Sequence, residues 1–271
     1  MISKIKVGVI QLNSSKDRSE NLQNASELIE KSVNAGAEMV ALPEAFSCFT
    51  GDSQKWDYSE SHEDSPTLQF LKEQARRHNI FLHGGSFHVR SDLNGKVFNR
   101  SYVISQKGEI LCHYDKMHLF DVQLDDGKQY FESDVSLQGQ SPVHCNIGGV
   151  CMGLSICYDL RFPELYRFLS RSGARLLFVP SAFTYTTGKA HWEMLLRARA
   201  VENQCYIIAA NQFGEHENGL RTWGHSMIVD PWGEILAQAE DGKSFTVAEI
   251  DFDKQTKLRH NIPVLKHRRM S

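Results

Sequence analysis

Three side chains that can take part in covalent chemistry stand directly after apolar or β-rich runs of this sequence: Glu44, Lys116 and Cys157. Catalytic and ligand-binding groups of open α/β sheets gather at the carboxyl ends of strands. Each residue also has an ordinary interpretation, as a surface carboxylate, a solvated charge or a small core residue. Their shared position just past a strand favours one common site.

Together these residue types suit the hydrolysis of an amide. A thiol attacks a carbonyl carbon only as it loses its proton, so a carboxylate such as Glu44 is a suitable neighbouring base. The oxyanion that forms needs fixed positive charge, which the Lys116 ammonium and a backbone N–H can supply. The carboxylate can then pass its proton to the departing amine. The sequence has no phosphate-binding glycine loop and no metal motif, so we expect no metal and no cofactor.

The local sequence places Cys157 on a sharp turn. Residues 150–156 have the length and apolar content of a buried strand. Pro163 suits the first turn of a helix, because it lacks an N–H that would be unpaired there. We therefore expect Cys157 at a strand end beside a helix N-terminus, where free N–H groups favour a thiolate. The alternative is a cysteine that serves only as a small hydrophobic core residue.

The composition sets the broad class of the protein. The chain has 271 residues, of which 41% are hydrophobic and 23% charged, and its net charge is −3. This balance is typical of a soluble globular protein and gives no reason to expect nucleic acid or a membrane as partner. No run approaches the ~18 apolar residues of a transmembrane helix, and no signal-peptide core is visible, so we expect a cytoplasmic protein. The six cysteines lack CxxC and metal-ligand spacing, which argues against disulfides and structural zinc.

Strand and helix patterns alternate along the chain, which predicts mixed α/β layers in a single domain, residues 1–271. Three further expectations concern segments between these elements. Residues 51–63 are expected to form a loop. Residues 120–140 are expected to form a long, irregular and acidic segment, here called the excursion, that contributes a wall of a pocket. Residues 235–239 and 245–250 are expected to pair as a closing hairpin.

The flanks of the three reactive residues resemble the catalytic motifs of the nitrilase superfamily of carbon–nitrogen hydrolases, and the similarity extends over nearly the whole chain. The resemblance implies a four-layer α-β-β-α sandwich. It also implies roles for the residues: Glu44 as base, Lys116 as oxyanion stabiliser and Cys157 as nucleophile, with the backbone N–H of Tyr158 completing the oxyanion hole. Many members carry a second glutamate after the lysine, and Glu132 matches it; the alternative for Glu132 is a loop carboxylate.

Within the superfamily the chain looks like the Nit branch, on residues 157–165, 180–193, 197–206 and 224–233. The resemblance implies hydrolysis of deaminated glutathione, a small-molecule amide. Other activities stay open: an ω-amidase acting on 2-oxoglutaramate or 2-oxosuccinamate, a carbamoylase, or a catalytically silent scaffold. Met117 and residues 125–128 depart from the usual pattern of the branch. These departures put the choice of substrate in doubt, but not the class of reaction.

Several residues are candidates for substrate binding. Arg161 could pair with a substrate carboxylate through its planar guanidinium, the alternative being a salt bridge to Asp159 or Glu164. Further candidates for the pocket are Phe183 and Thr187, whose alternative is loop packing. For a second carboxylate the candidates are Arg221, His216 and the segment of residues 120–132. The sequence around His216 more readily indicates a solvated loop than a metal ligand.

The resemblance also implies a homodimer or a higher homo-oligomer, with the helix after Cys157 in or near the interface. The tail, residues 261–271, contains Ile262, Pro263, Val264 and Leu265. Such an apolar segment is unusual in free solvent, so we expect it to dock on a neighbouring subunit.

Overall fold

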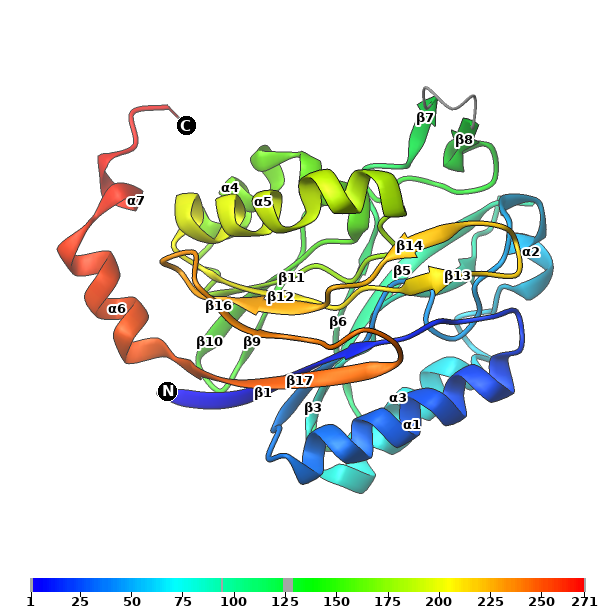
Figure 1. Cartoon of the computed structure of the whole chain (residues 1–271), viewed down its shortest axis with the longest axis horizontal. Coiled ribbons are helices and arrows are strands. Elements are labelled where there is room, and N and C mark those ends of the chain that lie inside the picture. The colour runs from blue at the N-terminus through cyan, green and yellow to red at the C-terminus, as the bar shows by residue number, and fades with distance from the viewer. Residues whose placement is uncertain (1, 94, 124–128, 271) are drawn as a thin grey trace.

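The computed structural model describes residues 2–93, 95–123 and 129–270, and its layers are clear in Figure 1. Helices α1 (Arg18–Asn34) and α3 (Pro66–His78) cover one sheet, and α4 (Pro163–Arg171) and α5 (Tyr185–Asn203) cover the other. The two sheets face each other between these helical layers. The expected α-β-β-α sandwich is confirmed.

The strands of each sheet come from one half of the chain, with one exception. The first sheet has the order β17 (Ser244–Asp251), β1 (Lys4–Gln11), β2 (Met39–Ala41), β3 (Phe81–His83), β5 (Val97–Ile104) and β4 (Phe87–Arg90), with β6 (Ile110–Asp115) also paired to β5. The second has the order β16 (Ile235–Gln238), β15 (Met227–Val229), β12 (Tyr206–Ala209), β11 (Leu176–Phe178), β10 (Val150–Leu154) and β9 (His144–Ile147). The exception is β17, which joins the first sheet from the end of the chain.

Local sequence signals explain where the outer helices begin. The side chain of Asp17 accepts a hydrogen bond from Glu20 N at the start of α1, and Ser65 accepts one from Leu68 N at the start of α3. Such caps pair backbone N–H groups that the first helical turn leaves without partners. Pro66 then occupies the first turn of α3, where its missing N–H carries no penalty.

Side chains on the strands alternate between two apolar cores. Met39 and Ala41 of β2 belong to the core between the sheets, whereas Val40 belongs to the core beneath α1 and α3. This alternation follows from the two-residue repeat of a strand. The central core also holds a histidine: His83 of β3 is buried and stacks on Phe178 of β11, with ring centroids 4.4 Å apart.

Three sequence-based expectations about the elements need correction. Residues 235–239 and 245–250 do not form a hairpin, because β16 pairs with β15 and β17 pairs with β1 in the other sheet. Residues 51–63 are not simply a loop, since they contain η1 (Asp52–Gln54) and α2 (Lys55–Tyr58). The excursion contains a small ribbon of β7 (Asp121–Gln123) and β8 (Gln129–Phe131), followed by η2 (Glu132–Asp134). Residues 125–128 lie outside the described part of the chain.

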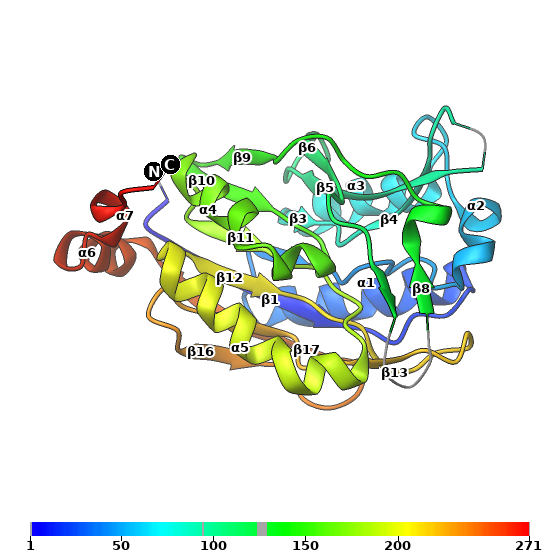
Figure 2. The ribbon, with the colours of Figure 1, turned by 90° about the horizontal axis from the view of Figure 1, so that it is seen from above.

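The last elements return to the end of the molecule where the chain starts. After β17 come α6 (Phe252–Asn261) and α7 (Val264–His267), and Figures 1 and 2 both show them at that end of the molecule. A second two-stranded ribbon, β13 (Phe213–Glu215) paired with β14 (Arg221–Trp223), lies near the start of α5. No helix in the described residues is long and apolar enough to span a bilayer.

Candidate active site

Cys157 occupies the sharp turn expected after β10. Its φ of 49° lies in the left-handed region, and its N–H donates to the carbonyl of Pro180 at 2.9 Å. A non-glycine residue in that region is conformationally costly and is held there by surrounding contacts. The turn continues as η3 (Cys157–Arg161), and α4 begins at Pro163.

Glu44 follows β2, and its carboxylate is fixed on both oxygens. Oε1 accepts hydrogen bonds from Asn99 Nδ2 at 2.8 Å and from Lys116 Nζ at 3.1 Å. Oε2 accepts one from the backbone N–H of Ala182 at 2.8 Å. Because the side chain is buried, these contacts hold the carboxylate in a single orientation.

Lys116 follows β6 and lies between two carboxylates. Its Nζ is 3.1 Å from Glu44 Oε1 and 2.9 Å from Glu132 Oε2. Burial alone would lower the pKa of the ammonium, but the charges of Glu132 and Glu44 outweigh it and hold the pKa well above its ordinary value. The lysine is therefore positively charged inside the protein.

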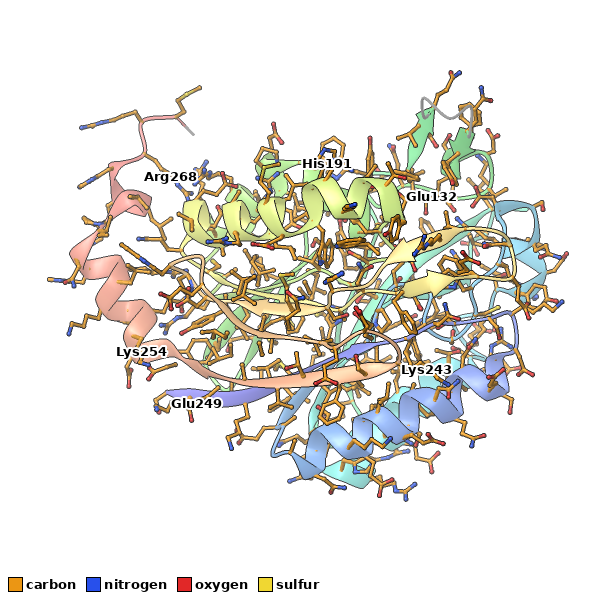
Figure 3. All side chains as sticks on the ribbon, viewed as in Figure 1. Glu132, His191, Lys243, Glu249, Lys254 and Arg268 are labelled. Atoms are coloured by element: carbon orange, nitrogen blue, oxygen red, sulfur yellow. The ribbon has the colours of Figure 1, made fainter. Side chains whose placement is uncertain are left out.

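Glu132 is buried rather than solvated on a loop. It begins η2 at the end of the ribbon, where Figure 3 labels it, and its Oε2 also accepts from the Phe120 N–H at 2.8 Å. Burial alone would raise the pKa of Glu132, but Lys116 and Lys55 outweigh it and hold the pKa well below its ordinary value. Glu132 is thus ionised and supports the charge on Lys116.

The Cys157 thiol is not the thiolate that its turn suggested. Burial, followed by the negative charge of Glu44, raises its pKa well above the ordinary value, although Lys116 acts in the opposite direction. A helix dipole would lower the pKa, but α4 begins only at Pro163 and a 3₁₀ turn intervenes. The resting site therefore contains a neutral thiol beside a carboxylate.

Asp159 connects the turn that holds Cys157 to the chain around Lys116. It is completely buried; Oδ2 accepts from the Tyr114 hydroxyl and the Ile156 N–H, both at 2.8 Å. Oδ1 accepts from the backbone N–H of His118 at 3.0 Å and lies 2.6 Å from its Nδ1. These bonds bring residues from both sheets together, so the spacing of Lys116 and Cys157 depends on Asp159.

The reactive residues open onto a cavity of about 380 Å³. The excursion forms part of its wall, as expected, through Phe120, Gln129, Tyr130 and Glu132. Arg161, Phe183 and Thr187 also line it, together with Tyr158, the candidate for the oxyanion N–H.

Arg161 does not form either salt bridge considered from the sequence. Its guanidinium lies over the rings of Phe183 and Tyr158, at 5.2 and 5.9 Å from their centroids, and Nη1 is 3.4 Å from His191 Nδ1. Figure 3 labels His191 on α5. Among the described residues no carboxylate lies within ion-pair distance of Arg161. Asp159 is engaged elsewhere, so the guanidinium keeps its capacity to bind an anion.

Two residues suggested for a second carboxylate do not line the cavity. His216 is buried, with Nδ1 2.9 Å from the Ser14 carbonyl oxygen and Nε2 2.8 Å from Thr222 Oγ1, so the expected solvated loop is wrong. The guanidinium carbon of Arg221 lies over the ring of Tyr185, 3.7 Å from the ring centroid. Within the described residues, no group of three or more His, Cys, Asp or Glu side chains is arranged to hold a metal ion.

Sequence reasoning missed two polar residues of the site. Asn99 is a buried strand residue whose amide orients Glu44, and Lys55 lies at the start of α2 with its ammonium near Glu132. An asparagine within the β-rich stretch 97–104 was a weak signal for Asn99. Nothing in the local sequence distinguished Lys55 from a surface lysine.

Comparison with known proteins identifies the family. The carbon–nitrogen hydrolase family model matches residues 6–260. The chain belongs to the carbon–nitrogen hydrolase family. It is therefore a hydrolase of carbon–nitrogen bonds other than peptide bonds. A relative from Synechocystis sp., named deaminated glutathione amidase, is 44% identical over 262 residues, covering 96% of each chain.

Solved structures of this hydrolase family share the fold over nearly the whole chain. NitFhit of Caenorhabditis elegans has a TM-score of 0.92 and 39% identity, covering 98% of this chain and 65% of that longer one. Nit3 of Saccharomyces cerevisiae, a member of branch 10 of the nitrilase superfamily, has a TM-score of 0.90 and 34% identity, covering 99% and 97%. The resemblance to the Nit branch is thus confirmed.

Proposed function

We propose that this hydrolase cleaves the amide of deaminated glutathione, giving 2-oxoglutarate and Cys-Gly through a cysteine thioester. The observation that carries the proposal is the meeting of Glu44, Lys116 and Cys157 at one cavity, although they are distant in sequence. The neutral thiol beside a fixed carboxylate supports a nucleophile with its own base.

In the first half of the reaction, Cys157 Sγ attacks the amide carbonyl carbon while Glu44 takes the thiol proton. Negative charge develops on the carbonyl oxygen, and the Lys116 ammonium and the Tyr158 N–H stabilise it. Collapse of this intermediate breaks the C–N bond, and Glu44 gives its proton to the departing nitrogen. The products of this half are free Cys-Gly and a thioester on Cys157.

In the second half, water replaces the amine. Glu44, again ionised, takes a proton from the attacking water, and the same donors stabilise the second oxyanion. The C–S bond then breaks, and the proton held by Glu44 returns to sulfur, which restores the thiol. Glu132 acts throughout by holding Lys116 in place, since its Oε2 lies 2.9 Å from Nζ.

Substrate recognition uses the remaining cavity residues. Arg161 pairs with the carboxylate of the 2-oxo acid, because it lines the cavity with its planar guanidinium over the rings of Phe183 and Tyr158. Thr187 donates a hydrogen bond to the 2-oxo group, and Phe183 packs against the methylene carbons. The names of relatives support this choice of substrate, among them human deaminated glutathione amidase.

The test compares kcat/KM for deaminated glutathione and 2-oxoglutaramate with one enzyme preparation. A preference for deaminated glutathione is expected, and a clear preference for 2-oxoglutaramate would favour the ω-amidase alternative. Release of carbon dioxide together with ammonia from an N-carbamoyl amine would favour a carbamoylase. No turnover of any of these, together with no substrate protection of Cys157 from iodoacetamide, would favour a silent scaffold.

We also propose a homodimer that buries the outer faces of α4 and α5. Large apolar side chains are exposed there, including Phe168, Met194 and Val201, and tail residues Ile262 and Val264 are also partly exposed. Isolated exposed apolar residues are ordinary, but a group on neighbouring helices indicates an interface. Light scattering at micromolar concentration should give twice the chain mass, and Phe168→Glu should shift it toward the monomer. A monomeric wild-type mass would contradict the proposal.

A further inference from the structure

Three of the described residues that line the cavity are cationic: Lys55, Lys116 and Arg161. The proposed reaction uses Lys116 for the oxyanion and Arg161 for the 2-oxo acid carboxylate. Deaminated glutathione carries a second carboxylate, on the glycine of its leaving group. Arg221 and His216 do not line the cavity, so among the described cavity residues Lys55 is the cation left to pair with that carboxylate.

The position of Lys55 is unusual for a lysine with only structural contacts. Its side chain is 10% exposed, and its Nζ lies 2.8 Å from Asp52 Oδ1 and 3.7 Å from Glu132 Oε1. An ammonium has N–H donors in three directions, so one close carboxylate does not exhaust it. The side chain of Asp52 is 40% exposed and can replace its contact with Lys55 by water. Lys55 thus has capacity for an anion inside the cavity.

The distance from Lys55 to the reacting carbonyl fits a dipeptide. Glu132 links the two ammonium groups, with Oε2 2.9 Å from Lys116 Nζ and Oε1 3.7 Å from Lys55 Nζ. The two nitrogens are therefore at most roughly 9 Å apart, while an extended two-residue chain spans about 7 Å. A carboxylate at the end of Cys-Gly can reach Lys55 when the scissile carbonyl oxygen lies at Lys116.

We propose that Lys55 binds the glycine carboxylate of the Cys-Gly leaving group and thereby determines specificity for dipeptide amides. The inference rests on the proposed function, because it assigns one residue of that same site. Lys55 contacts the part of the substrate that leaves, whereas Arg161 contacts the part that becomes the thioester. A primary amide such as 2-oxoglutaramate makes no use of Lys55.

The test combines a change in the enzyme with a matched change in the substrate. The two substrates are deaminated glutathione and its glycine N-methylamide, which lacks the negative charge. Wild-type enzyme should favour the acid in kcat/KM by about 10- to 100-fold, the range of a buried charge-assisted contact. Lys55→Met should reduce this ratio to near one, and Lys55→Arg should retain most of it. The loss of Lys55 can also disturb Glu132. Such a disturbance changes kcat/KM equally for both substrates, so it cancels in the ratio of the two values.

The controls separate the possible failures. Lys254→Met changes an exposed lysine on α6 and should leave the wild-type ratio unchanged. A wild-type ratio near one, or a Lys55→Met ratio equal to that of wild type, overturns the role of Lys55 but leaves the proposed function intact. Should Lys55→Met fail to fold, a wild-type ratio near one still overturns the role of Lys55. A wild-type enzyme that cannot hydrolyse deaminated glutathione overturns the proposed function and, with it, this assignment.

Discussion

Glu132→Gln is a sharp test of how the buried charges act together. The amide keeps the shape of the side chain and an oxygen that can accept from Lys116 and from the Phe120 N–H. The change removes one negative charge 2.9 Å from Lys116 Nζ. With an effective dielectric constant of about 20, unit charges at that separation attract by about 6 kcal/mol. Much of this attraction is offset by the cost of burying both charges.

The measurable effects are smaller than the attraction itself. Glu44 still neutralises Lys116, and the new amide still accepts a hydrogen bond, so we expect a loss of roughly 2 kcal/mol in the free energy of unfolding. The ammonium is then drawn toward Glu44 and away from the developing oxyanion. A displacement of that kind should lower kcat by about 10²-fold.

Urea unfolding and steady-state release of Cys-Gly, measured on the same preparation, check both values. Glu249→Gln is the matched control, because Glu249 pairs with Lys4 at 2.7 Å on the surface, where Figure 3 labels it. An exposed pair contributes about 0–1 kcal/mol, and kcat should be unchanged in this control. Wild-type kcat in Glu132→Gln would show that Lys116 needs no second carboxylate and would refute the reasoning.

Three other changes test separate parts of the site and the core. Cys157→Ala should lower turnover by at least about 10³-fold with an unchanged circular dichroism spectrum; near-normal activity would exclude Cys157 as nucleophile. Lys116→Met should lower kcat by about 10²- to 10³-fold, and an effect on KM alone would make Lys116 a ground-state contact. Burial lowers the pKa of His83 to about 3, whereas the unfolded ring takes a proton near pH 6.5, so stability should fall by up to about 1.4 kcal/mol per pH unit between those values as the pH is lowered. His83→Gln should show a shallower fall in urea titrations across that window, and an identical slope would mean that other groups cause it.

The sequence was sufficient for features that depend on neighbouring residues. The helix start at Ser65–Pro66 and the strand that ends before Cys157 are encoded within a few positions. For the first helix the sequence offers Ser19 or Asp17 as the cap, and the structure has Asp17. The common site of Glu44, Lys116 and Cys157 could be inferred because strand ends in such sheets converge. Family resemblance then added Glu132, for which local sequence gave only an acidic residue in an irregular stretch.

The errors arose where distant segments decide the outcome. The pKa of Cys157 is raised first by burial and then by the charge of Glu44, which comes from the opposite sheet, and the sequence around Cys157 reports neither effect. His216 lies among glutamates and glycine in sequence, yet Ser14 and Thr222 enclose it. The strands at residues 235–238 and 244–251 are close in sequence but pair with different partners, since β17 has all of β1 available in the other sheet.

The pairing of β1 with β17 also bears on how the chain folds. Every residue of Lys4–Gln11 is paired with β17, whereas β2 pairs only with Val7–Val9 on the other side. During synthesis β1 emerges long before β17, so the edge of the first sheet that β1 forms stays unpaired until β17 has been made. Contacts of such long sequence separation slow folding, and an unpaired strand edge promotes aggregation in the meantime. Shortening the chain before β17 should therefore yield insoluble protein rather than a smaller folded enzyme.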